Sequence, residues 1–182
     1  MKIGCLGWGS LVWNLRALPV QKCWFCDGPL LPIEFARHSN EDRITLVLTP
    51  GAATVQSLWI LMLVTDLSNA ISSLANRENT SQENIGYWCL ASTHQNESSE
   101  IIGNWASHIG LDAVVWTALP PKFNDQSGRI PTVDEVISFL QNLPQERQKN
   151  AEEYIRKTPR QIDTKYRRRI EAELNWTPIG EI

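Results

Sequence analysis

The feature that most constrains the fold is an uninterrupted apolar run at residues 58–64, Leu-Trp-Ile-Leu-Met-Leu-Val. A strand with apolar side chains at both sets of alternating positions is typical of a sheet whose two faces are buried. The run is far shorter than the roughly 20 apolar residues that a membrane-spanning helix needs. We therefore expect residues 57–64 to form a central strand of a folded, non-membrane domain.

Short strands and two helices occupy the first two-thirds of the chain. After Pro120-Pro121 the pattern changes to a polar loop at residues 122–130 and then to helices, the first of which begins with a predicted capping box of Thr132 and Glu135. This layout indicates an α+β fold. The other strands are expected at residues 2–6, 31–37, 43–48, 86–91 and 112–119, and the helices at 67–76, 98–109, 132–143, 144–157 and 163–174.

Three consecutive arginines, at positions 167–169, lie in the last of these helices. They are a candidate phosphate or nucleic-acid patch. Glu171 and Glu173 lie beside them, however, and an apolar stripe with i+4 spacing predicts that the arginines occupy the opposite, solvated face. We expect an ordinary charged surface here. The stripe consists of Ile162, Tyr166, Ile170 and Leu174.

Length and charge limit the classes of partner. With 182 residues, 42% of them hydrophobic, the chain can bury one sizeable core. A formal net charge of −3 gives no electrostatic reason to expect nucleic acid or an anionic membrane as a partner. Lys2 is followed by glycines and polar residues rather than by the apolar segment of a signal peptide. We expect a soluble, cytoplasmic protein that binds neither nucleic acid nor membranes.

The four cysteines raise the question of a metal or redox site. Cys23 and Cys26 form a Cys-x-x-Cys unit, but a structural zinc site usually needs a second such pair or two histidines. Cys5 and Cys89 lie in apolar strand-like runs, where we expect buried thiols. The prediction is therefore reduced cysteines without a metal, and a metal or thiol site at Cys23 and Cys26 is kept as the alternative.

The opening strand runs directly into Gly7-Trp8-Gly9-Ser10-Leu11. Glycines that flank an aromatic residue let the backbone turn sharply and bring its N–H groups close to a ligand. Such a loop is a candidate cradle for an anion or a carbonyl oxygen, and the aromatic ring can line a pocket. The alternative is a turn that local packing alone requires.

A glutamate follows the first predicted helix. The pair Arg77-Glu78 lies between this helix and the strand that begins at Gly86-Tyr87. A partly desolvated glutamate at a helix end is suited to proton transfer. The alternative is a solvated ion pair on the surface.

Together these segments resemble a known family. Residues 7–14, Gly-Trp-Gly-Ser-Leu-Val-Trp-Asn, are similar to the loop that opens the γ-glutamylcyclotransferase-like proteins, and especially to its ChaC-like branch. In that family a strand and a helix are followed by the essential glutamate and then by a Gly-Tyr strand start, an order that residues 57–91 repeat. Glu78 matches the essential glutamate. The family usually has tyrosine at the position of Trp8 and glycine or lysine at that of Asn79.

The resemblance implies a fold and a reaction. The fold is a small mixed β-barrel with packed helices over residues 1–120, and residues 121–182 add a helical C-terminal extension. The reaction releases 5-oxoproline from a small γ-glutamyl amine or amide, with Glu78 as general acid and base and without metal or cofactor. Another interpretation is a non-catalytic module on the same fold that binds a small ligand or a protein. The residues implied to bind substrate are Gly7, Trp8, Gly9, Ser10 and Leu11.

Overall fold

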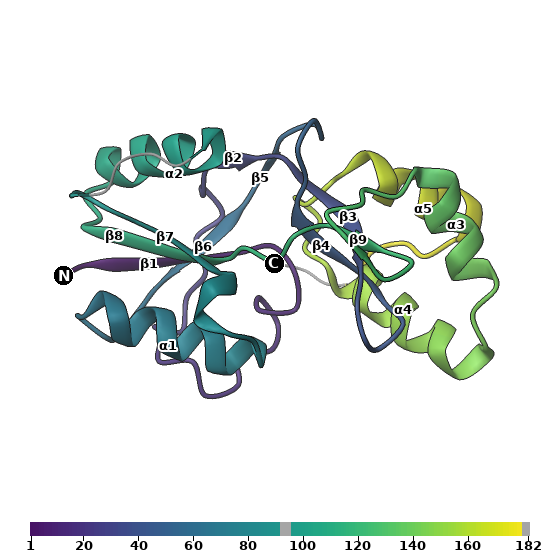
Figure 1. Ribbon diagram of the computed structural model, residues 1–182, viewed down its shortest axis with the longest axis horizontal. Coiled ribbons are helices and arrows are strands. Elements are labelled where there is room, and N and C mark those ends of the chain that lie inside the picture. Colours follow the sequence, from purple (N-terminus) through teal and green to yellow (C-terminus); the bar gives the residue numbers. More distant parts are fainter. Residues whose placement is uncertain (92–95, 180–182) are drawn as a thin grey trace. The chain divides into compact units, whose positions relative to one another are not determined.

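The computed structural model describes residues 1–91 and 96–179, which form two compact units (Figure 1). The segments that lie in the predicted first domain, residues 1–120, are divided between both units. The chain passes from unit one to unit two for the last time between Leu119 and Pro120. Unit one comprises Met1–Gly7, Asn14–Leu31 and Gln56–Leu119, and unit two comprises Trp8–Trp13, Pro32–Val55 and Pro120–Ile182.

Unit one is built on a mixed four-stranded sheet with the order β6-β1-β8-β7. Strand β1 is parallel to β8 and antiparallel to β6, and β7 is antiparallel to β8. Helices α1 and α2 cover opposite faces of this sheet (Figure 1). The strands are β1 (Ile3–Gly7), β6 (Leu58–Leu61), β7 (Ile85–Cys89) and β8 (Ala113–Thr117); the helices are α1 (Leu67–Glu78), α2 (Glu97–His108) and the short 3₁₀ turn η1 (Gln82–Asn84).

The pattern of the apolar run at residues 58–64 predicts a central strand, and this prediction is wrong. Strand β6 lies at one end of the sheet order, and β1 and β8 are the central strands. Its outer edge is nevertheless paired, because Phe25 N–H donates to Trp59 O at 2.8 Å and Trp59 N–H donates to Phe25 O at 3.0 Å. Val20 and Met62 form a second bridge on the same side. The run is apolar because both faces of β6 are buried, whatever its rank in the sheet.

Unit two is built on a second mixed sheet, with the order β10-β9-β3-β4. Strand β3 pairs with β4 antiparallel and with β9 parallel. The strands are β3 (Ile33–His38), β4 (Ile44–Leu48), β9 (Lys122–Phe123) and β10 (Gln126–Ser127), and the helices are α3 (Val133–Gln141), α4 (Gln145–Lys157) and α5 (Lys165–Leu174). Two short strands, β2 (Leu30–Leu31) and β5 (Val55–Gln56), lie where the sequence passes between the units.

The polar loop predicted at residues 122–130 is wrong, because this segment contains the β9–β10 hairpin. Asn124 and Asp125 connect its strands with φ values of 48° and 59°. Positive φ at both central residues is the geometry of a tight two-residue hairpin turn, and asparagine and aspartate tolerate it.

The predicted solvated face at residues 167–169 is wrong for one of its arginines. Arg167 is 1% exposed, and its guanidinium donates to backbone carbonyls that precede α5. Arg168 and Arg169 are exposed and pair with carboxylates, as expected for a charged surface. The helix therefore buries its first arginine beside the apolar stripe.

Two mixed sheets and five α-helices in the described ranges confirm the predicted α+β class. Both four-stranded sheets are open, and no closed barrel is found among the described residues. The capping box of Thr132 and Glu135 is confirmed at the start of α3. Within residues 1–91 and 96–179, no helix is long and apolar enough to span a membrane.

Candidate active site

The pair Arg77-Glu78 forms the last two residues of α1, whereas the sequence pattern predicts a helix end near residue 76. The helix continues to Asn79, which has φ 52° and ψ 50° and donates its N–H to Asn76 O at 3.2 Å. This left-handed cap conformation suits glycine and asparagine.

Arg77 is directed inward and is only 6% exposed. Its Nε donates to the carbonyl oxygen of Asn14 at 3.1 Å, and its Nη2 donates to the same oxygen. Its Nη1 donates to Oε1 of Glu78 at 2.6 Å. The carbonyl of Arg77 accepts in turn from Nη1 of Arg16 at 2.9 Å. The end of α1 is thus bound to the segment that follows the opening loop.

The side chain of Glu78 is 19% exposed and is paired with the buried Arg77. Its charge also acts on Cys5, a fully buried residue of β1. Burial raises the pKa of the Cys5 thiol well above its usual range, and the charge of Glu78 raises it further. Cys5 therefore stays protonated and is no thiolate nucleophile.

Gly86 of unit one is a position where close packing requires a glycine. Gly86 of β7 lies opposite Trp116 of β8 in the sheet register. A Cβ atom at Gly86 would lie 2.3 Å from the indole ring of Trp116. The glycine therefore lets this ring cross β7. Tyr87, the next residue, has a half-exposed side chain.

The opening loop ends β1 at Gly7 and continues in unit two as Trp8–Trp13. Trp8 is buried, and its indole Nε1 donates to Leu46 O at 3.3 Å. Val12 N–H donates to Gly9 O at 2.9 Å and closes a turn. Ser10 is half-buried and Leu11 is buried. Residues Trp8–Leu11 and Glu78 belong to different units, so a joint site remains the prediction made from the sequence.

Tyr154 of α4 explains why the loop contains Gly9. A Cβ atom at Gly9 would lie 2.5 Å from the Tyr154 hydroxyl oxygen, whereas the φ of Gly9 is not in the left-handed region. Close approach is therefore the physical requirement for this glycine. The same hydroxyl accepts from Leu46 N–H at 3.3 Å. The Tyr154 ring packs edge-on against the Trp13 ring, with 5.5 Å between the ring centroids.

The sequence patterns do not indicate Tyr154 as a site residue. Its only signal is a place on the buried face of α4 with Ala151 and Ile155. Because the partners of that face are more than one hundred residues away in the sequence, the pattern gives burial but not the contact with Leu46. The C-terminal helices thus contribute a side chain to the surroundings of the opening loop in unit two.

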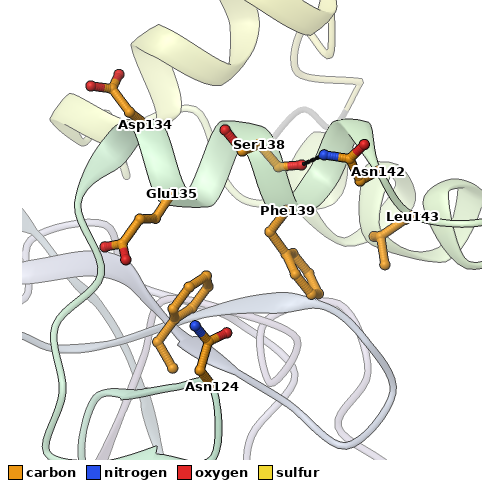
Figure 2. A pocket seen from close by; sticks show the side chains of 8 residues that line it. Asn124, Asp134, Glu135, Ser138, Phe139, Asn142 and Leu143 are labelled. Carbon is orange, nitrogen blue, oxygen red and sulfur yellow. Dashed lines mark hydrogen bonds between the residues drawn. The ribbon is translucent and has the colours of Figure 1, made fainter.

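The cysteine pair and a pocket of unit two are two further places where chemistry could be sought. Cys23 and Cys26 are exposed thiols, and the described residues contain no group of three or more His, Cys, Asp or Glu side chains placed to hold a metal. An open pocket of about 510 Å³ lies in unit two beside α3, and Figure 2 shows Phe139 pointing from that helix toward the side that carries Asn124. The pocket is lined by Phe123, Asn124, Asp134, Glu135, Ser138, Phe139, Asn142 and Leu143.

Comparison of the chain with protein-family models, curated proteins and solved structures gives no match.

Proposed function

We propose that the chain is a γ-glutamylcyclotransferase-like enzyme of the cytoplasm. It releases 5-oxoproline from a small γ-glutamyl amine or amide. The observation that carries the proposal is a partly exposed glutamate, Glu78, held at a helix end by the buried Arg77. This arrangement supports proton transfer, because the carboxylate is fixed on one side and accessible on the other. The proposal includes the small mixed β-barrel of the resembling family.

The reaction is an intramolecular acyl transfer. The α-nitrogen of the substrate attacks its own γ-carbonyl carbon and closes a five-membered lactam, and the bond from that carbon to the leaving amine breaks. The α-ammonium group loses two protons in total, and the leaving nitrogen gains two and departs as an ammonium ion. Glu78 accepts a proton from the first nitrogen and returns it to the second. Holding the chain bent supplies a large part of the rate.

The opening loop has the second role in this proposal. Residues Gly7, Trp8, Gly9, Ser10 and Leu11 hold the glutamyl end of the substrate. Backbone N–H groups of such a loop stabilise the negative charge that develops on the carbonyl oxygen. The buried packing of Trp8 and Gly9 supports a rigid loop, since neither residue can move without disturbing Leu46 or Tyr154.

The test is release of 5-oxoproline from a panel of γ-glutamyl amines and γ-glutamyl amino acids, followed by mass spectrometry. We expect turnover by the wild-type protein and none by Glu78→Gln, which keeps the shape of the side chain but cannot carry the proton. Glu83→Gln is the matched control, because Glu83 is an exposed glutamate five residues further on, and it should retain wild-type activity.

Two outcomes contradict the proposal in different ways. Comparable turnover by Glu78→Gln would show that another group transfers the proton. Binding of 5-oxoproline or a γ-glutamyl compound in calorimetry, without turnover of any panel member, would instead identify the protein as a binding module.

A further inference from the structure

Arg77 makes a set of contacts that a surface ion pair does not need. A buried guanidinium loses its hydration, and that cost is offset only where its N–H groups find acceptors. Two of its nitrogens, Nε and Nη2, donate to the single carbonyl oxygen of Asn14, while Nη1 donates to Glu78. One rigid planar group therefore connects the backbone of Asn14 to the carboxylate.

The pairing of Arg77 with Glu78 is also unusual for a helix. Side chains at adjacent helical positions point about 100° apart, and favourable ion pairs on a helix surface are spaced i, i+3 or i, i+4. Nη1 of Arg77 nevertheless reaches Oε1 of Glu78 at 2.6 Å, with both residues in the last turn of α1.

We propose that Arg77 is a positioning residue, which fixes the Glu78 carboxylate relative to the backbone at Asn14, just after the opening loop. The inference depends on the proposed function, and it adds the means by which the proton-transfer group is oriented. A lysine cannot replace the arginine in this role, because a single ammonium group lacks the rigid fork that reaches two acceptors in fixed directions. Misplacement of a reacting group by about 1 Å costs on the order of a hundredfold in rate.

The experiment compares Arg77→Met and Arg77→Lys with wild type and with Arg168→Met, the matched control. Arg168 is an exposed arginine that pairs with Asp163 and has no part in the proposed site, so the kinetics of Arg168→Met should stay within about threefold of wild type. For Arg77→Met we expect kcat to fall about a hundredfold while KM changes less than about threefold, since the arginine touches the carboxylate and not the substrate. Arg77→Lys should lose at least tenfold in kcat. Circular dichroism verifies the fold of each variant.

A second readout works without turnover. The chemical shift of the Glu78 side-chain carboxylate carbon, labelled with carbon-13 and assigned with Glu78→Gln, should change in Arg77→Met and Arg77→Lys but not in Arg168→Met. Unchanged shift and unchanged kcat in folded Arg77 variants would overturn the positioning role. In that case the proposed function still stands if Glu78→Gln is inactive. If the wild type is inactive on the whole substrate panel, the proposed function fails, and the carbon-13 shift alone decides whether Arg77 orients Glu78.

Discussion

Replacement of Arg167 by methionine should cost the protein several kcal/mol of stability, although two neighbouring arginines are dispensable. The Arg167 guanidinium donates to the carbonyl oxygens of Thr158 at 2.8 Å, Pro159 at 2.6 Å and Ile162 at 3.0 Å. It also donates to the Glu171 carboxylate at 2.9 Å. One side chain therefore satisfies the acceptors of the turn that connects α4 to α5.

The magnitude follows from those acceptors. Methionine fills most of the volume but donates no hydrogen bond, and each buried acceptor left without a donor costs about 1–3 kcal/mol. Part of this loss is recovered, because burying the charge is itself unfavourable, and burial lowers the pKa of Arg167 for that reason. We expect a net loss of about 2–4 kcal/mol in the free energy of unfolding, because the buried carbonyl oxygens of Thr158 and Ile162 would each lose the Arg167 donor.

The assay is urea unfolding of wild type, Arg167→Met and the control Arg168→Met, followed by far-ultraviolet circular dichroism. The Arg168 side chain is 68% exposed and pairs with Asp163 on the surface, so its replacement should cost less than about 1 kcal/mol. A loss below about 1 kcal/mol in Arg167→Met, or equal losses in both variants, would refute the view that the buried guanidinium holds this turn.

Two further predictions concern unit two. Gly9→Ala should destabilise the protein by about 1–3 kcal/mol, because the new Cβ atom would lie 2.5 Å from the Tyr154 hydroxyl. In a double-mutant cycle measured by urea unfolding, adding Tyr154→Phe should recover part of this loss. Strictly additive losses of the two single variants would exclude the clash. Burial raises the pKa of Glu34, against opposing hydrogen bonds from Thr164 and from the N–H groups of Phe35 and Tyr166. The folded state therefore binds this proton more tightly than the unfolded state, so the wild type should gain stability relative to Glu34→Gln as the pH falls from 7 toward the unfolded pKa of about 4.3. Urea unfolding of both proteins at several pH values measures this, and a difference that does not vary with pH would contradict it.

Local patterns predict the helices and most of the strands, because each helix buries one face with the helical period and strands such as β1, β6 and β8 are short apolar runs. The helix at residues 132–143 is an example, since Thr132 and Glu135 mark its start and the structure has the capping box there. The β9–β10 hairpin was missed because its strands have two residues each, too few to show a period. Its signal was the Asn124-Asp125 pair, which tolerates the positive φ of a tight turn.

The candidate site was predictable only where its chemistry is local. Glu78 stands at a helix end that the sequence places within two residues. The roles of its surroundings depend on distant segments: Arg77 binds a carbonyl 63 residues away, and Tyr154 accepts from a backbone amide 108 residues away. A helical period can indicate that an arginine or a tyrosine is buried, but it does not indicate which residue that side chain contacts. The same reason explains Arg167, which periodicity assigned to solvent.

The alternation of segments between the two units has a consequence for synthesis on the ribosome. All the segments of unit one have been made once residue 119 is synthesised. Unit two cannot be completed at that point, because β3 still lacks its partner β9 and all three helices of unit two are absent. Unit one can therefore fold first, while Trp8–Trp13 and Pro32–Val55 wait with exposed apolar side chains for Pro120–Ile182. A chain that stops near residue 120 would keep those segments exposed and should be prone to aggregation and proteolysis.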